Sequence, residues 1–156
     1  MQLAIHIEIL ASIEKVWAAI SDIAHAEKMI SRIMAIEVLE QPEHGLVGLK
    51  WKETRKMFGK EATEIMWITD AIENEFYCTR AESHGCVYIS RLSLSSLGSN
   101  SQLTMSFAGE PQTWGAKILS FYMNFLIQSS IKKELTKDLS DIKHHVEQQS
   151  SAKVLT

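Results

Sequence analysis

The sequence predicts an α+β fold in which seven antiparallel strands form a sheet that is covered by one long C-terminal helix. Three observations lead to this prediction. Segments with the two-residue alternation of strands follow one another across the middle of the chain, separated by short turns that contain Gly or Asn. Apolar residues near the C-terminus recur at three- and four-residue steps. At 156 residues the chain fits one domain, which we assign to residues 1–148.

The first strand is expected at residues 3–9, where apolar residues alternate with polar or small ones. Ser12 is placed as the N-cap of a short helix at 13–22, which has one apolar face. A second short helix is expected at 24–31. These two helices lie between the first and second strands, so they can close one end of the sheet.

Six further strands complete the predicted sheet. They are expected at 32–41, at two segments within 51–67 on either side of a turn, at 75–83, at 86–96 and at 101–109. Pro111 then fits the first turn of a helix that runs from residue 112 to about residue 148, a segment with one Gly and no Pro. Residues 149–156 are expected to form a frayed tail.

Composition and charge exclude several classes of protein. The hydrophobic fraction of 46% and the charged fraction of 22% are ordinary for a globular domain. Sixteen Lys and Arg against nineteen Asp and Glu give a net charge of -3, so we expect no nucleic-acid partner. The N-terminus does not have the pattern of a signal peptide, and the longest apolar segment, 118–127, is too short to span a bilayer. We predict a cytoplasmic protein without stable membrane insertion.

No motif for a cofactor or a metal is present. The glycine-rich nucleotide loops, the GxSxG elbow and the HExxH zinc motif are all missing. His144 and His145 are adjacent on a helix, so their rings point about 100° apart and do not form the ligand pair of a zinc site. Cys78 and Cys86 lack the CxxC spacing and are interpreted as buried free thiols. The sequence therefore predicts neither a cofactor nor a metal site.

Two segments resemble a known family. Residues 11–22, with their Val-Trp pair, look like the first helix of the START-like or SRPBCC superfamily, and residues 133–147 are similar to its closing helix. The hairpin at 45–69 lies between them in the expected place. This superfamily includes the birch pollen allergen, lipid-transfer START domains, and polyketide cyclases and dehydratases. The resemblance implies the helix-grip fold, in which a curved sheet wraps around the long helix and leaves a deep, mainly apolar cavity.

The hairpin has charged residues on its more apolar face. With Gly59 and Lys60 as the central residues of a type II′ turn, Arg55 lies opposite Glu64. Glu53 shares their face, whereas the other face has three lysines and three threonines. We therefore predict that Glu53, Arg55 and Glu64 point inward, where one guanidinium can bind two carboxylates. This cluster is either a structural ion pair that fixes strand register or an anchor for a polar group of a ligand.

The candidate ligand-binding residues come from the hairpin, the last strand and the first half of the long helix. They are Trp51, Glu53, Arg55, Met57, Glu64, Met66, Met105, Phe107, Trp114, Ile118, Phe121, Tyr122 and Phe125. The helix residues are included because residues 114–127 are apolar nearly all round, which indicates a core, a cavity wall or a partner surface. A homodimer is therefore left open. No catalytic residue is assigned, because Arg55 should lower the pKa of a neighbouring glutamate whereas acid–base catalysis needs a raised one.

Three functions are compatible with these residues and with the resemblance. The first hypothesis is a protein that binds a hydrophobic small molecule, such as a lipid, a quinone or a polyketide-like compound, with the Arg/Glu cluster as its polar anchor. The second is an enzyme similar to the polyketide cyclases and dehydratases, in which Glu64, Glu53 or Tyr122 moves protons in the same cavity. The third is a protein-interaction or chaperone-associated role for the apolar half of the long helix.

Overall fold

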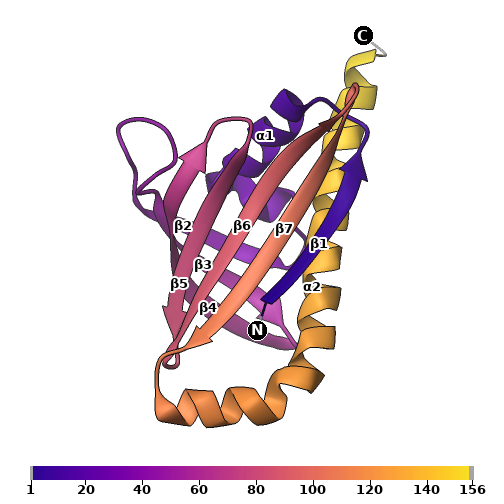
Figure 1. The fold of residues 1–156 in the computed structure, drawn as a ribbon. Coiled ribbons are helices and arrows are strands. Elements are labelled where there is room, and N and C mark those ends of the chain that lie inside the picture. Colours follow the sequence, from indigo (N-terminus) through magenta and orange to yellow (C-terminus); the bar gives the residue numbers. More distant parts are fainter. Residues whose placement is uncertain (1, 155–156) are drawn as a thin grey trace.

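The computed structural model describes the backbone of residues 2–154 and the side chains of that range outside 119–126. Its sheet has seven antiparallel strands in the order β1-β7-β6-β5-β4-β3-β2. Figure 1 shows that the sheet is strongly curved and that the long helix α2 lies beside it, next to β1. The predicted helix-grip fold is confirmed.

The elements agree closely in order with the prediction. They are β1 (Gln2–Ile9), α1 (Ile13–Ser21), the 3₁₀ helix η1 (Ile23–Lys28), β2 (Ile33–Glu40), β3 (Lys50–Met57), β4 (Lys60–Ile72), β5 (Phe76–Ser83), β6 (Cys86–Leu97), β7 (Asn100–Pro111) and α2 (Trp114–Val154). Ser12 caps α1 as expected, since its hydroxyl accepts a hydrogen bond from the backbone N–H of Lys15. The thiols of Cys78 and Cys86 are free but only half-buried.

Both ends of α2 differ from the prediction. Pro111 is the last residue of β7 and pairs with Cys86, so it does not start the helix. The helix begins after Thr113, whose hydroxyl accepts a hydrogen bond from the backbone N–H of Ala116, as an N-cap does. At the other end α2 continues through Val154, whereas the predicted helix ends at about residue 148. No Gly or Pro interrupts that last stretch.

Helix α2 changes direction along its length. In Figure 1 its first part, drawn in orange, crosses the end of the sheet after β7, and the remainder turns and runs along β1. Only the second part contributes to the described core, through Leu139, Ile142 and Val146. Among the residues that the structure describes, no helix is both long enough and apolar enough to cross a membrane.

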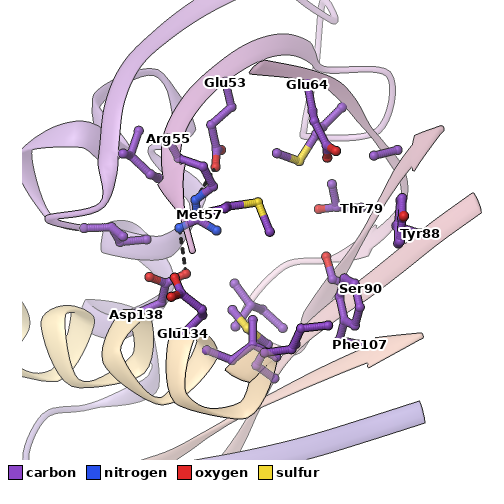
Figure 2. A pocket seen from close by; sticks show the side chains of 18 of the residues that line it. Glu53, Arg55, Met57, Glu64, Thr79, Tyr88, Ser90, Phe107, Glu134 and Asp138 are labelled. Carbon is purple, nitrogen blue, oxygen red and sulfur yellow. Dashed lines mark hydrogen bonds and ion pairs between the residues drawn. The ribbon is translucent and has the colours of Figure 1, made fainter. Parts of the chain in front are cut away.

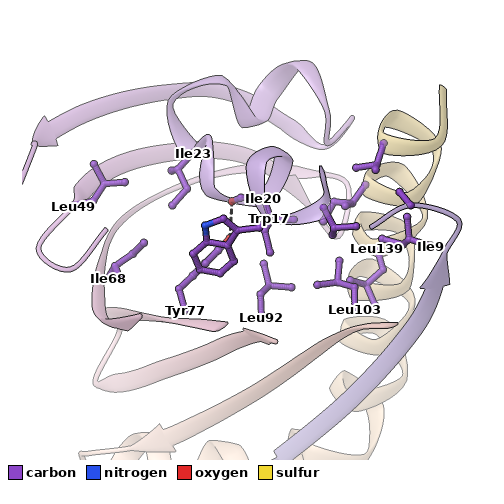
Figure 3. Packing of buried hydrophobic residues seen from close by; sticks show 14 of the residues in the cluster. Ile9, Trp17, Ile20, Ile23, Leu49, Ile68, Tyr77, Leu92, Leu103 and Leu139 are labelled. Carbon is purple, nitrogen blue, oxygen red and sulfur yellow. Dashed lines mark hydrogen bonds between the residues drawn. The ribbon is translucent and has the colours of Figure 1, made fainter. Parts of the chain in front are cut away.

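The core fills one end of the space between the sheet and α2. Figure 3 shows Trp17 and Ile20 of α1 packed against strand residues that include Tyr77, Leu92 and Leu103. The ring of Trp17 meets that of Tyr77 edge-on, with 6.1 Å between centroids. The buried Tyr77 hydroxyl donates a hydrogen bond to the carbonyl of Ile20. α1 thus closes this end of the fold, and the rest of the interior is left to the cavity described below.

The turn between β3 and β4 is not the predicted one. Met57 pairs with Lys60, so the two central residues are Phe58 and Gly59 instead of Gly59 and Lys60. Both have positive φ angles, 51° and 76°, which is the combination that a type I′ turn requires. Phe58 is therefore a bulky residue held in the left-handed region.

The register of the hairpin is consequently two positions away from the predicted one. Glu53 pairs with Glu64, and Arg55 pairs with Ala62. The prediction that Arg55 lies directly opposite Glu64 is wrong. Because a shift of two residues leaves every side chain on its original face, the inward direction of Glu53, Arg55 and Glu64 is unaffected.

Replacing Phe58 with Asn is expected to stabilise the protein by about 1 kcal/mol, because a non-Gly residue in a sparsely populated backbone region costs about 1–3 kcal/mol and Asn tolerates positive φ. Phe58 is 54% exposed, so little burial is lost. Urea unfolding measures the change. Phe58→Ala is the control, since it removes the ring without easing the backbone, and an Asn variant no more stable than this Ala variant would contradict the prediction.

Candidate functional site

A cavity of about 650 Å³ lies between the sheet and α2, beside the core. Its wall is mainly apolar and is formed by the end of α1, by η1, by strands β2 to β7 and by α2, mostly through its second part. This volume is within the range of roughly 300–1,000 Å³ that is usual for small-molecule sites. The predicted residues of the hairpin and of the last strand all line it: Trp51, Glu53, Arg55, Met57, Glu64, Met66, Met105 and Phe107. That these residues contact a ligand stays a prediction.

The predicted helix residues whose side chains are described do not line the cavity. Trp114 is 81% exposed and Ile118 is 56% exposed. Both were expected inside, but they belong to the part of α2 that crosses the end of the sheet before the helix turns (Figure 1). The other three predicted helix residues, Phe121, Tyr122 and Phe125, lie outside the described side chains. The homodimer and the protein-interaction role stay predictions.

Arg55 is the centre of a charged cluster on one wall (Figure 2). Its Nη2 donates a hydrogen bond of 2.7 Å to Oδ2 of Asp138, and its Nε lies 3.3 Å from Oε1 of Glu53. The side chains of Arg55, Glu53 and Asp138 are 20%, 8% and 4% exposed. The guanidinium therefore serves two carboxylates, as expected, but the second of them is Asp138 of α2 and not Glu64.

Asp138 is a site residue that the sequence-based prediction missed. It is 83 positions from Arg55 in the chain, so no local pattern connects the two residues. A signal was nevertheless present, because Leu135, Asp138 and Ile142 stand at three- and four-residue steps. An acidic residue inside the apolar stripe of a helix is a candidate for a buried ion pair.

A second ion pair joins the same region of α2 to the sheet. Arg32, just before β2, pairs with Glu134, which also lines the cavity. Glu134 precedes Asp138 by one helical turn, so two consecutive turns of α2 are held to the β2–β3 side of the sheet by Arg32 and Arg55. This wall of the cavity is thereby kept in place by charges as well as by apolar packing.

Burial controls the ionisation of the two carboxylates of the cluster. It raises the pKa of Glu53, and this effect outweighs Arg55 and a hydrogen bond from Trp51, which both lower that pKa. Burial likewise raises the pKa of Asp138, although Arg55 lowers it. Burial alone would lower the pKa of Arg55, but Asp138 and Glu53 raise it. Arg55 thus lowers the pKa of Glu53 as expected, but burial outweighs it and the net direction is upward.

The wild-type protein is expected to lose stability relative to a Glu53→Gln variant as the pH rises. Because the folded-state pKa of Glu53 is above its ordinary value of 4.5, the folded protein holds this proton more tightly than the unfolded chain does. The contribution of Glu53 is thus fully present below that ordinary value and is lost as the pH rises through the folded-state pKa. Urea unfolding of both proteins across acidic to neutral pH measures the difference, and parallel pH profiles would contradict it.

A second group of polar side chains faces the cavity from β4, β5 and β6. It consists of Glu64, Thr79, Tyr88 and Ser90 (Figure 2). Thr79 and Ser90 are direct cross-strand partners. Burial, together with Cys86 and Glu64, raises the pKa of Tyr88 to about 12, so the phenol keeps its proton at neutral pH. This group therefore offers one carboxylate and three hydroxyls to the interior.

The hydroxyls of this group were also missed from the sequence. Strand β6 carries serines on both of its faces, so polarity alone did not indicate which face is the inner one. Thr79 is 6% exposed despite its polar side chain. The inner face of β6 is identified by its pairing, because Ser90 lies between Thr79 and the inward Phe107.

The structure was compared with known proteins, and solved structures with a similar fold were found. A scan against models of protein families finds no match, and no curated protein matches the sequence. A START superfamily protein from Mycobacterium smegmatis superposes with a TM-score of 0.77 at 16% identity, over 95% of this chain and 98% of the other. The chain has a START-like fold.

Two further structures share the START-like fold. The ZhuI aromatase/cyclase from Streptomyces sp. R1128 has a TM-score of 0.77 at 12% identity, with 96% of this chain and 95% of the other covered. Ara h 8.0201 has a TM-score of 0.71 at 15% identity, with 94% and 97% covered. At such identities the START-like likeness concerns the fold, and the function depends on the side chains in the cavity.

Proposed function

We propose that the chain binds a hydrophobic small molecule, such as a lipid, a quinone or a polyketide-like compound, in the cavity between the sheet and α2. The cavity of about 650 Å³ supports this most directly. Small-molecule sites combine apolar walls with a few polar groups that orient the ligand. In this proposal the Arg55 cluster anchors one end of the ligand, and Glu64 with the nearby hydroxyls contacts another part.

Binding is tested with N-phenyl-1-naphthylamine, a neutral dye whose fluorescence rises in apolar surroundings. The wild-type protein is expected to bind it, and Met66→Trp, which puts a larger side chain into the cavity wall, is expected to weaken binding at least about tenfold, or about 1.4 kcal/mol. Ile65→Trp is the matched control, since Ile65 is the neighbouring residue on β4 and is 45% exposed. Equal loss of binding in both variants, or no binding by the wild type, would contradict the proposal.

A polyketide cyclase or dehydratase-type enzyme is the second candidate. It is supported by the raised pKa of Glu53 and by Glu64, which has no hydrogen bond or ion pair with the residues that the structure describes. Among the structures with the same fold, ZhuI is an aromatase/cyclase. Native mass spectrometry separates the candidates: a carrier returns a bound polyketide-like compound with unchanged mass, whereas cyclisation with dehydration returns it lighter by one water.

A further inference from the structure

We propose that the ligand contacts the polar groups of the cavity through hydrogen-bond donors, and that it is a hydrophobic alcohol, phenol or amine without a carboxylate. This inference rests on the proposed function and specifies the chemical class of its ligand. Three features of the cavity support it: the saturated charge of Arg55, the unpartnered oxygen of Asp138, and the second group of acceptors around Glu64.

The charge of Arg55 is already balanced within the protein. Both Asp138 and Glu53 lie against its guanidinium. A ligand carboxylate at this place would have to compete with these two buried carboxylates and would lie next to them, where like charges repel. Arg32, just before β2, is engaged with Glu134. Lys117, the other basic residue of the described lining, comes from the first part of α2. The Arg55 cluster is therefore not an anchor for an anionic group.

One oxygen of the Asp138 carboxylate receives no hydrogen bond from the described residues. Oδ2 of this carboxylate receives the hydrogen bond from Arg55, but the buried Oδ1, like the buried Nε of Arg55, has no hydrogen-bond partner among the described residues. Asp138 lines the cavity, and its side chain is 4% exposed. A buried polar atom left without a partner costs about 1–3 kcal/mol. A hydroxyl or ammonium group of a ligand would supply the missing donor.

The sheet beside this cluster also offers acceptors, since Glu64 is the cross-strand partner of Glu53. Glu64 faces the cavity, and no hydrogen bond or ion pair joins it to another residue that the structure describes. The hydroxyls of Thr79 and Ser90 can accept as well as donate.

The described lining of the cavity has more acidic than basic residues. The acidic ones are Glu53, Glu64, Glu134 and Asp138, and the basic ones are Arg55 and Lys117. Hydrogen-bond donors on the ligand fit both groups of acceptors, whereas an anionic group would lie mostly among carboxylates.

The test compares three ten-carbon compounds that differ only in the head group: 1-decanol, decylamine and decanoate. Each is titrated at pH 7 against the wild-type protein loaded with N-phenyl-1-naphthylamine. We expect decanol or decylamine to displace the dye at a concentration at least tenfold lower than decanoate does. Whichever of decanol and decylamine displaces the dye at the lower concentration shows whether a neutral hydroxyl or an ammonium ion is the preferred donor.

The outcomes separate this inference from the proposed function. Dye binding together with displacement by decanoate at the same or a lower concentration than by the other two compounds would overturn the inference and leave the proposed function standing. Absence of dye binding, with no compound of the series retained in native mass spectrometry, would overturn both. Retention of decanol or decylamine but not decanoate in that measurement supports both.

A variant of Asp138 identifies the acceptor. Asp138→Asn keeps one oxygen for Arg55 and presents an NH₂ group in place of Oδ1, so the preference for decanol over decanoate should fall about tenfold. Asp141→Asn is the matched control, because the Asp141 carboxylate binds Ser31 instead of lining the cavity. If the Asp138 variant does not fold, Glu64→Gln makes the same change at the second group of acceptors. An unchanged preference in every folded variant would overturn the inference.

Discussion

Replacing Arg55 with Met is expected to destabilise the protein by about 3–5 kcal/mol at neutral pH, the usual loss when one partner of a buried ion pair is removed. Asp138 and Glu53 would both stay buried with no cation beside them. Without Arg55 the pKa values of these carboxylates should rise further, because the guanidinium lowers both. The loss should therefore shrink as the pH falls and the carboxylates take up protons. Urea unfolding at several pH values measures it.

An exposed ion pair provides the control for Arg55. Arg80 pairs with Glu82 on β5, and both side chains are largely in solvent. Arg80→Met should cost no more than about 1 kcal/mol, because surface ion pairs contribute little. Removing the two carboxylates as well, by adding Glu53→Gln and Asp138→Asn to Arg55→Met, should restore part of the lost stability. A similar small loss for Arg55→Met and Arg80→Met would contradict the prediction.

Replacing Leu139 with Ala is expected to destabilise the protein by about 2–5 kcal/mol, as is usual for a buried Leu that leaves a cavity behind. Leu139 is 2% exposed and packs into the core from α2 (Figure 3). The second part of α2 is held to the fold largely through this packing, so the helix that forms one wall of the ligand cavity depends on it. The free energy of unfolding in urea gives the size of the loss.

The adjacent Ser140 is the control for Leu139. It is exposed on the same helix, so Ser140→Ala should change the stability by less than about 0.5 kcal/mol, with a slight gain from the better helix propensity of Ala. Leu139→Ala should also weaken binding of the naphthylamine dye, since the loosened helix forms the cavity wall. Comparable stabilities of the two variants would show that α2 is anchored elsewhere.

In the hairpin, the position of the turn was predicted wrongly, but the inward direction of the charged side chains was predicted correctly. The turn was expected at Gly59 and Lys60, yet the structure places it at Phe58 and Gly59. A Phe with positive φ is disfavoured by local sterics, so local preference pointed to the wrong pair of residues. The inward direction of Glu53 and Arg55 was nevertheless correct, because it depends on the alternation along each strand and not on the register.

The first half of α2 shows the opposite case. Residues 114–127 are apolar nearly all round, which indicated a core, a cavity wall or a partner surface, and Trp114 and Ile118 were among the predicted ligand-binding residues. Trp114 and Ile118 are exposed instead, since the helix crosses the end of the sheet before it turns along β1. Composition indicates that a helix has apolar surface, but the path of the helix through space determines what that surface meets.

By itself, the sequence determined the order of the elements, the class of fold and the inward face of the hairpin, because each follows from periodicity within a few residues. Only the tertiary structure decided that Arg55 meets Asp138, that the first part of α2 crosses the end of the sheet, and that Thr79 and Ser90 face inward. These features depend on contacts between segments far apart in the chain. The strength of such contacts comes from burial, which exists only once the sheet has closed around the helix.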